Sequence, residues 1–226
     1  MSMVSDKRAR VIAIDGPSGS GKGTVSTAVA SHLGWHYLDS GAVYRVLGFL
    51  AHEKGVALDD VDGLVAIAQS LDVSFRGTEV WLDGTEIRGE IRTEEAGKRA
   101  SLVSPIPEVR KTLLEWQRSQ AREPGLVADG RDMGSVVFPD AFLKIFLTAS
   151  AESRAERRFK QLRDKGFDVN IRQLFQEITE RDERDLKRKA SPLKAADDAV
   201  VLDTTEMRID EVVGEVLSRA ESLLGH

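Results

Sequence analysis

Short apolar runs alternate along the chain with longer amphipathic stretches. The runs have the length of strands, and they are Val11–Asp15, His36–Asp39, Leu126–Asp129, Leu143–Leu147 and Ala199–Asp203. Helical periodicity is found near Thr24–Leu33, Val109–Arg122, Ala151–Lys165, Ile171–Lys189 and Ile209–Leu224. Strands that alternate with helices predict a parallel sheet covered on both faces. We therefore expect a three-layer α/β fold around a five-stranded parallel sheet.

Two regions interrupt this alternation. Val73-Ser74-Phe75 and Val80-Trp81-Leu82 resemble short antiparallel strands separated by turn residues, inside a long segment between the second and third core strands. Further along, Arg154 to Asn170 is dense in basic residues. We expect a substrate subdomain with a small antiparallel sheet over 41–107 and a short helical lid over 154–170. The core would then comprise 1–40, 108–153 and 171–226.

The composition narrows the class of protein. The chain has 226 residues, of which 41% are hydrophobic and 31% charged, as in ordinary globular proteins. Its net charge of −5 gives no overall basic field for nucleic acid, and the absence of cysteine excludes disulfides and thiolate sites. Neither a signal peptide nor a membrane-spanning segment is evident. We expect a cytoplasmic monomer that acts on small molecules.

A glycine-rich loop follows the first predicted strand and precedes the first helix. It consists of Gly16, Pro17, Ser18, Gly19, Ser20, Gly21, Lys22, Gly23 and Thr24. Glycines let successive backbone N–H groups converge, and the helix N-terminus adds donors and a positive dipole end. Lys22 can reach the outer phosphates of a bound triphosphate. A plain connecting turn is the competing interpretation, but the strand–loop–helix order favours a P-loop that binds ATP.

The end of this loop departs from the commonest form. Gly23 stands where Ser or Thr usually follows the lysine, and Thr24 comes one position later. The ending Lys-Gly-Thr is typical of nucleoside monophosphate kinases. The pattern leaves open whether Thr24 contacts Mg²⁺ directly or through water.

Two further motifs follow predicted strands. In Leu38–Arg45, Asp39 or Ser40 can cap a helix that carries Arg45 close to its N-terminus, a position suited to an anionic group. In Val127–Gly134, a turn at Gly130 places Asp129, Arg131 and Asp132 at the carboxyl edge of the sheet, where ligands of open α/β sheets bind. Solvated surface charges are the alternative for both motifs.

Several arginines supply positive charge near the predicted loop. Phosphoryl transfer depends chiefly on positioning and on positive charge around crowded phosphate oxygens. The candidates are Arg154, Arg157, Arg158, Arg181, Arg184 and Arg188. Among them we favour Arg157, Arg181 and Arg188, although spacing alone does not choose, and most such charges lie on solvated helix faces.

Together these motifs resemble those of the bacterial cytidylate kinases. The resemblance rests on Ile14–Thr24, Leu38–Arg45 and Asp129–Gly134, and it extends from about Val11 to Leu202. Further matching segments are Gly89–Thr93, Phe138–Ala141 and Lys165–Phe167. The resemblance implies reversible, Mg²⁺-dependent transfer of a phosphoryl group from ATP to CMP or dCMP. It also implies a parallel-sheet core, an enlarged monophosphate-binding insert and a short lid.

The same resemblance assigns roles to individual residues. It implies that Arg131 contacts the acceptor phosphate, and we expect Lys22, Arg131, Arg157 and Arg181 to act on the transferring phosphoryl group. It implies an acceptor site formed by Ser40, Tyr44, Arg45, Ser101, Arg110, Arg131, Asp132, Arg181, Asp185 and Arg188. Within this set, Ser101, Arg110 and Asp132 correspond to the residues that hold cytosine.

The cytosine assignment is chemically reasonable. Asp132 can accept from the exocyclic amine, while Arg110 and Ser101 can donate to the ring nitrogen and carbonyl. Uracil would direct a carbonyl at the carboxylate and leave buried groups unpaired, at a cost of about 1–3 kcal/mol. A GTPase-type switch would need an Asn-Lys-x-Asp motif, yet the only asparagine, Asn170, precedes Ile171-Arg172. A small-metabolite kinase with the same core is the remaining alternative.

Overall fold

A computed structural model describes residues 9–77, 79–87, 89–164, 166, 168–187 and 192–225. Arg188, one of the predicted acceptor-site residues, lies outside these ranges, as do Lys165 and Phe167 of the matching segment near the lid. Within the described part of the chain, no helix is long and apolar enough to cross a membrane.

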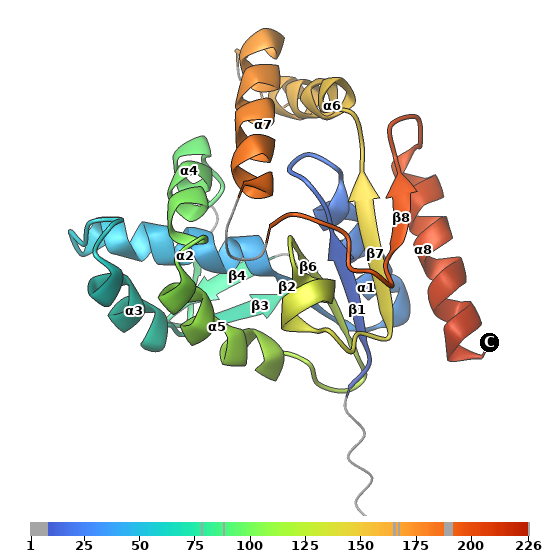
Figure 1. Ribbon diagram of the computed structural model, residues 1–226, viewed down its shortest axis with the longest axis horizontal. Coiled ribbons are helices and arrows are strands. Elements are labelled where there is room, and N and C mark those ends of the chain that lie inside the picture. Colours follow the sequence, from blue (N-terminus) through green and yellow to red (C-terminus); the bar gives the residue numbers. More distant parts are fainter. Residues whose placement is uncertain are drawn as a thin grey trace, which may run out of the picture.

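The core is the predicted five-stranded parallel sheet, in the order β2-β6-β1-β7-β8 (Figure 1). The strands are β1 (Val11–Asp15), β2 (His36–Asp39), β6 (Leu126–Gly130), β7 (Leu143–Thr148) and β8 (Val200–Asp203). All five agree with the apolar runs of the sequence to within one residue at each end. The register pairs Asp39 with Asp129 and Asp15 with Gly130, so these strand ends meet at one edge.

Apolar side chains on both faces of the sheet hold the layers together. Ile12 and Ile14 of β1 pack on one face against α1 (Lys22–Leu33) and α8 (Ile209–Leu224). Val11 and Ala13 pack on the opposite face, which α2 (Ser40–Glu53) and α5 (Pro107–Ser119) cover. A strand buried on both faces reads as a continuous apolar run, which is why β1 was visible in the sequence.

Helix α5 begins earlier than the sequence pattern indicated. We expected it near Val109–Arg122, but α5 begins at Pro107, with Ile106 as its N-cap residue. Proline is favourable at the first position of a helix, because its missing N–H would have no partner there. The helix therefore begins two residues earlier and ends three residues earlier than expected, and Arg110 lies in its first turn.

The insert contains the predicted antiparallel sheet, with one additional strand and two additional helices. Its strands are β3 (Val73–Arg76), β4 (Glu79–Leu82) and β5 (Thr85–Ile87), of which β5 was not predicted. Two helices of the insert, α3 (Val61–Gln69) and α4 (Glu94–Val103), were also not predicted. The apolar side chains of the insert share one cluster with α2, α5 and one face of the core sheet.

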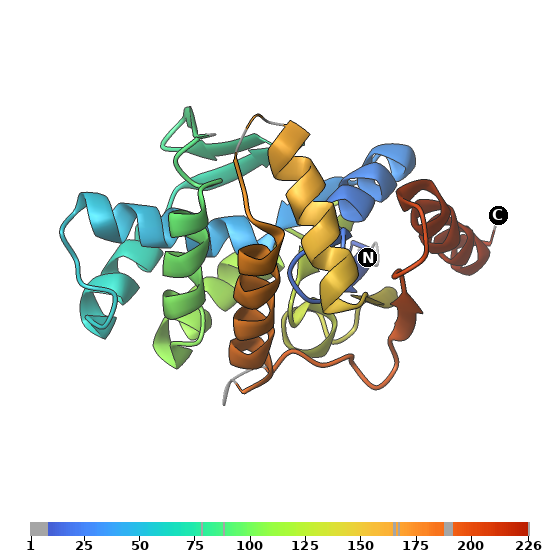
Figure 2. The ribbon, with the colours of Figure 1, turned by 90° about the horizontal axis from the view of Figure 1, so that it is seen from above.

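Two long helices, α6 (Ala151–Asp164) and α7 (Ile171–Leu186), project above the carboxyl edge of the sheet and pack against each other (Figures 1 and 2). Asn170 caps α7 by accepting from the backbone N–H groups of Arg172 and Gln173. The predicted lid therefore comprises most of α6 and the approach to α7. Its division from the core at 154–170 stays a prediction.

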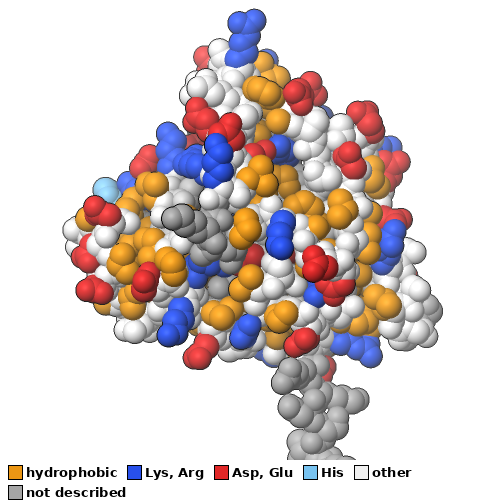
Figure 3. All heavy atoms as spheres, in the orientation of Figure 1, with side chains coloured by type: hydrophobic (Ala, Val, Ile, Leu, Met, Phe, Trp, Pro, Cys, Tyr) orange, Lys and Arg blue, Asp and Glu red, His pale blue; other side chains and the backbone are white. Residues whose placement is uncertain are grey.

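The surface carries charges of both signs. On the face shown in Figure 3, basic, acidic and hydrophobic side chains are interspersed, without one extended basic field. Seen from above, α7 lies between α4 of the insert and α6 (Figure 2). This arrangement sets the insert on one side of α7 and the glycine-rich loop on the other.

Candidate active site

The glycine-rich loop lies at the end of β1 and forms one wall of a cleft of about 1260 Å³. Ser18 to Thr24 line this cleft, whereas Gly16 and Pro17 form the base of the loop. A Cβ atom at Gly16 would lie 2.2 Å from the Leu147 carbonyl oxygen, so only glycine fits against β7. Gly21, the N-cap residue of α1, has a φ of 88°, a left-handed conformation that glycine adopts without strain.

Lys22 and Asp129 form the charged centre of the cleft. The Lys22 Nζ donates to the Pro17 carbonyl at 3.1 Å. Desolvation and the nearby Arg131 lower the pKa of Lys22 to about 7, against the opposing effect of Asp129. Desolvation and the Asp39 carboxylate raise the pKa of Asp129 to about 7. Two crowded carboxylates beside a lysine with a lowered pKa favour a ligand that brings both phosphate charge and a cation.

The side chains around position 23 explain why a glycine stands there. A Cβ atom on Gly23 would lie 3.3 Å from Asp129 Oδ2 and 3.8 Å from the Tyr37 hydroxyl oxygen. The Tyr37 hydroxyl donates to Asp129 Oδ2 at 2.9 Å. The space that a larger residue would occupy is thus taken by a hydrogen-bonded tyrosine–aspartate pair, with Thr24 exposed beside it.

The opposite wall carries the residues expected to recognise an acceptor base. Arg110, in α5, donates to Asp132 Oδ2 and, at 3.2 Å, to the Ser104 carbonyl. Arg110 also lies 3.4 Å from the Tyr44 hydroxyl, to which it donates. Ser101 donates to the Gly97 carbonyl at 3.0 Å. The predicted residues lining this part of the cleft are Ser40, Tyr44, Arg45, Ser101, Arg110 and Asp132.

The turn after β6 is held by the strand that leads into the loop. The buried Asp15 carboxylate accepts from the backbone N–H groups of Met133 and Gly134, each at 2.8 Å. These bonds fix the start of a π-helical turn, Met133–Val137, directly after Asp132. Desolvation raises the pKa of Asp15 to about 6, although both backbone hydrogen bonds oppose that shift.

Arg131 and Asp185 are brought together from segments 54 residues apart. The Arg131 Nε donates to Asp185 Oδ2 at 3.0 Å, and Asp185 is only 1% exposed. Arg131 lines the cleft, as does Arg181 on the same helix as Asp185. Asp185 itself does not line the cleft. In this structure it holds the side chain of Arg131, which does.

The other candidate arginines occupy different environments. Arg157 lines the cleft and donates to the Thr204 carbonyl and, at 3.2 Å, to the Thr204 hydroxyl. Arg158 also lines the cleft and forms an ion pair with Glu94 of α4, which links α6 to the insert. Arg154 is nearly fully buried and donates a hydrogen bond to the Ser18 carbonyl of the glycine-rich loop.

Sequence reasoning missed several residues that line the cleft. Tyr37, Asp39, Arg92 and Ser104 lie there together with the predicted set. Arg92 belongs to the segment Gly89–Thr93, which matches the family, and this match could have identified it as a site residue. Tyr37 has no comparable signal, because an aromatic residue in a predicted strand is ordinarily part of the core.

A glycine-rich loop on a parallel sheet, facing a polar wall across a deep cleft, defines this protein as a phosphoryl-transfer enzyme of the P-loop class. A family model for cytidylate kinase matches residues 12–222. The chain therefore belongs to the cytidylate kinase family, which confirms the resemblance found in the sequence.

Individual relatives agree with this assignment. The chain is 56% identical to the cytidylate kinase of Aeromonas salmonicida over 96% of both chains. It is 55% identical to that of Aeromonas hydrophila subsp. hydrophila, again over 96% of both chains. A solved structure of an uncharacterised protein from Eubacterium ventriosum has a TM-score of 0.52 at 12% identity, covering 95% of this chain and 99% of that one. This last likeness concerns the fold alone.

Proposed function

We propose that this chain transfers the γ-phosphoryl group of ATP to CMP or dCMP, giving ADP and CDP or dCDP. The observation that carries the proposal is a single cleft with a phosphate-binding loop on one wall and the Arg110–Asp132 pair on the other. The first feature suits a nucleoside triphosphate, and the second suits a base with both donor and acceptor atoms.

The donor side is formed by the loop from Gly16 to Thr24. Its backbone N–H groups and the N-terminus of α1 would bind the phosphates of ATP, and Lys22 would neutralise the outer ones. Bound phosphates would raise the pKa of Lys22 above its value of about 7. The lysine would then carry its full charge when the transfer takes place.

The acceptor side would hold CMP by its phosphate, sugar and base. Arg131 and Arg45 would contact the acceptor phosphate, since both line the cleft between the two walls. Ser40 and Tyr44 line the same part of the cleft, and Arg181, Asp185 and Arg188 are assigned to sugar or phosphate by the family resemblance.

The base would be read by three side chains. Asp132 would accept from the cytosine amine, and Arg110 and Ser101 would donate to the ring nitrogen and carbonyl. Uracil in the same orientation would leave a carbonyl facing the Asp132 carboxylate. The cost of about 1–3 kcal/mol corresponds to a roughly tenfold to hundredfold preference for cytosine.

The site also fits Mg²⁺ bound together with ATP. Asp129 has a raised pKa because a second carboxylate, that of Asp39, lies close to it, and a divalent cation would relieve this repulsion. Asp129 and Thr24 are the residues that would hold the ion, directly or through water. When bound, Mg²⁺ would neutralise phosphate charge.

Positive side chains would stabilise the transferring phosphoryl group. Lys22, Arg131, Arg157 and Arg181 all line the cleft, and we assign them to the oxygens of this group. Closure of the lid over 154–170 would bring further charge to the site. That closure, a monomeric state and a cytoplasmic location stay predictions from the sequence.

A coupled assay of ADP release tests the proposal. Purified protein with ATP and Mg²⁺ would be offered CMP, dCMP, UMP, AMP or shikimate. We expect CMP and dCMP to give the highest kcat/KM, with UMP roughly tenfold to hundredfold lower. A preference for shikimate would favour the small-metabolite alternative, and equal rates with CMP and AMP would overturn the cytosine assignment.

A further inference from the structure

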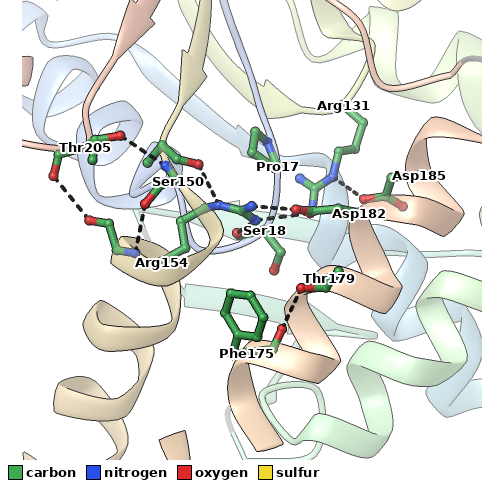
Figure 4. Close-up of polar contacts among 12 residues, drawn as sticks. Pro17, Ser18, Arg131, Ser150, Arg154, Phe175, Thr179, Asp182, Asp185 and Thr205 are labelled. Carbon is green, nitrogen blue, oxygen red and sulfur yellow. Dashed lines mark hydrogen bonds and ion pairs between the residues drawn. The ribbon is translucent and has the colours of Figure 1, made fainter. Parts of the chain in front are cut away.

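Arg154 contacts the phosphate-binding loop from behind. It lies in the first turn of α6, is 4% exposed, and does not line the cleft. Its Nε donates to the Ala149 carbonyl at 3.0 Å, and its Nη1 donates to the Ser18 carbonyl, also at 3.0 Å. Figure 4 shows the guanidinium between Ser18 and Asp182.

The bond to the Ser18 carbonyl determines the direction of a donor in the loop. The carbonyl of Ser18 and the N–H of Gly19 belong to one planar trans peptide, so they point in opposite directions. A carbonyl drawn toward Arg154 therefore turns the Gly19 N–H away from Arg154. Gly19 lines the cleft, and a Cβ atom there would lie 3.2 Å from the Arg154 Cβ. Arg154 thus restricts both the position and the orientation of this peptide.

Asp182 of α7 holds Arg154 in turn. Its two carboxylate oxygens accept from Arg154 at 3.1 and 2.5 Å, a paired contact between guanidinium and carboxylate. The side chain of Asp182 is 19% exposed and that of Arg154 is 5% exposed, so water screens the pair only weakly. Loss of the carboxylate would leave a buried cation with carbonyl partners only.

The same face of α7 also holds the acceptor side. Asp185 lies three residues after Asp182, which places the two side chains next to each other on the helix. Asp182 binds Arg154, which contacts the donor loop, and Asp185 binds Arg131, which lines the cleft (Figure 4). One helix thus links both walls through two carboxylates, the buried one of Asp185 and the half-buried one of Asp182.

We propose that Arg154 and Asp182 are positioning residues for the donor-phosphate loop, because their ion pair orients the Ser18–Gly19 peptide for ATP. This inference rests on the proposed ATP site but not on the identity of the acceptor. Neither residue needs to touch the nucleotide. Loss of the pair should weaken ATP binding and transfer while leaving the acceptor site largely unchanged.

The test compares Arg154→Met and Asp182→Asn with matched exposed controls. Arg172→Met removes an exposed arginine from α7, outside the lid, and Glu183→Gln removes the carboxylate next to Asp182, which pairs only at the surface with Lys187. ATP binding would be measured by calorimetry without acceptor. The KM values for ATP and CMP, kcat and the melting temperature would be measured on the same preparations.

We expect Arg154→Met to raise the Kd and KM for ATP by roughly tenfold to hundredfold, with the KM for CMP changed less than threefold. Asp182→Asn keeps the size of the side chain and should give a smaller change in the same direction. Both substitutions break the same ion pair. The variant that combines them should therefore bind ATP no more weakly than Arg154→Met alone. Both controls should match the unmodified protein.

Two results would overturn the inference. One is unchanged ATP affinity in both variants, whether or not the melting temperature falls, which would make the pair merely structural. The other is an equal loss of ATP and CMP affinity. Failure of the unmodified protein to bind ATP would instead overturn the proposed function, and this inference with it. If Arg154→Met does not fold, Asp182→Asn with its Glu183→Gln control decides the question.

Discussion

Gly23 faces Asp129 so closely that a Cβ atom on the glycine would lie 3.3 Å from the Asp129 Oδ2. The glycine belongs to the first turn of α1, and the aspartate lies at the end of β6. Glycine is unfavourable within a helix by about 1 kcal/mol relative to alanine. Its presence here is therefore better explained by the space that Asp129 and the Tyr37 hydroxyl require than by the helix.

Gly23→Ala tests this explanation. The added methyl group would displace the Asp129 carboxylate by a few tenths of an ångström, while the helix itself gains propensity. We expect an unchanged or slightly raised melting temperature together with a several-fold lower kcat/KM for ATP. Calorimetry of unfolding and steady-state kinetics on one preparation would measure both. Unchanged kinetics in a well-folded variant would mean that the contact has no functional importance.

Lys22→Met separates charge from packing at the loop. The methionine keeps the length and most of the apolar contact of the lysine but cannot neutralise phosphate. We expect kcat to fall by roughly a hundredfold or more, as when one preorganised group that stabilises a transition state is removed. The melting temperature should not fall, because desolvation already lowers the pKa of Lys22 to about 7 and makes its charge costly. Turnover within tenfold of normal would exclude the assigned role.

Asp15 should make stability depend on pH. Its pKa is raised from 3.8 to about 6, so between pH 4 and 6 the folded state retains a proton that the unfolded state has lost. Its contribution to the free energy of unfolding is therefore greatest at low pH and falls as pH rises through this range, by about 3 kcal/mol in total. An Asp15→Asn variant lacks this dependence.

Urea unfolding at pH 4, 5 and 6 would measure the effect. The free energy of unfolding of Asp15→Asn, relative to the unmodified protein, should rise across these three values. Asp59→Asn, which changes an exposed carboxylate, should give a nearly constant difference. A constant difference for Asp15→Asn as well would show that the buried carboxyl does not titrate in this range.

The sequence predicted the core of the fold because its strands are buried on both faces. Such strands appear as short, largely apolar runs, as in Ile12–Ile14 and Leu143–Leu147, and longer helical segments separate all of them except β6 and β7. The insert gave weaker signals. Strand β5 has only three residues, and α3 and α4 are short helices whose stability comes from packing against α2 and α5.

The site was predictable where local motifs carry the chemistry. The loop from Gly16 to Thr24 and the turn around Asp132 both form walls of one cleft, as their places after strands indicated. Contacts between distant segments were not predictable. Asp15 meets Met133 across 118 residues, and Arg154 meets Ser18 across 136. Such pairs depend on the order of strands in the sheet, which a single sequence does not specify.

Asp132 is the residue that we propose selects cytosine as the acceptor base. Asp132→Ala should erode selectivity, but it would also leave Arg110 as a half-buried cation without its partner. Asp132→Asn is the cleaner variant, because its oxygen can still accept from Arg110 while its amide offers a donor to uracil.

The decisive measurement is therefore the ratio of kcat/KM for CMP to that for UMP, in the unmodified protein and in Asp132→Asn. We predict a ratio well above ten in the unmodified protein and a fall of roughly tenfold to hundredfold in the variant, with the KM for ATP nearly unchanged. The same ratio in both proteins would mean that Asp132 does not select the acceptor base.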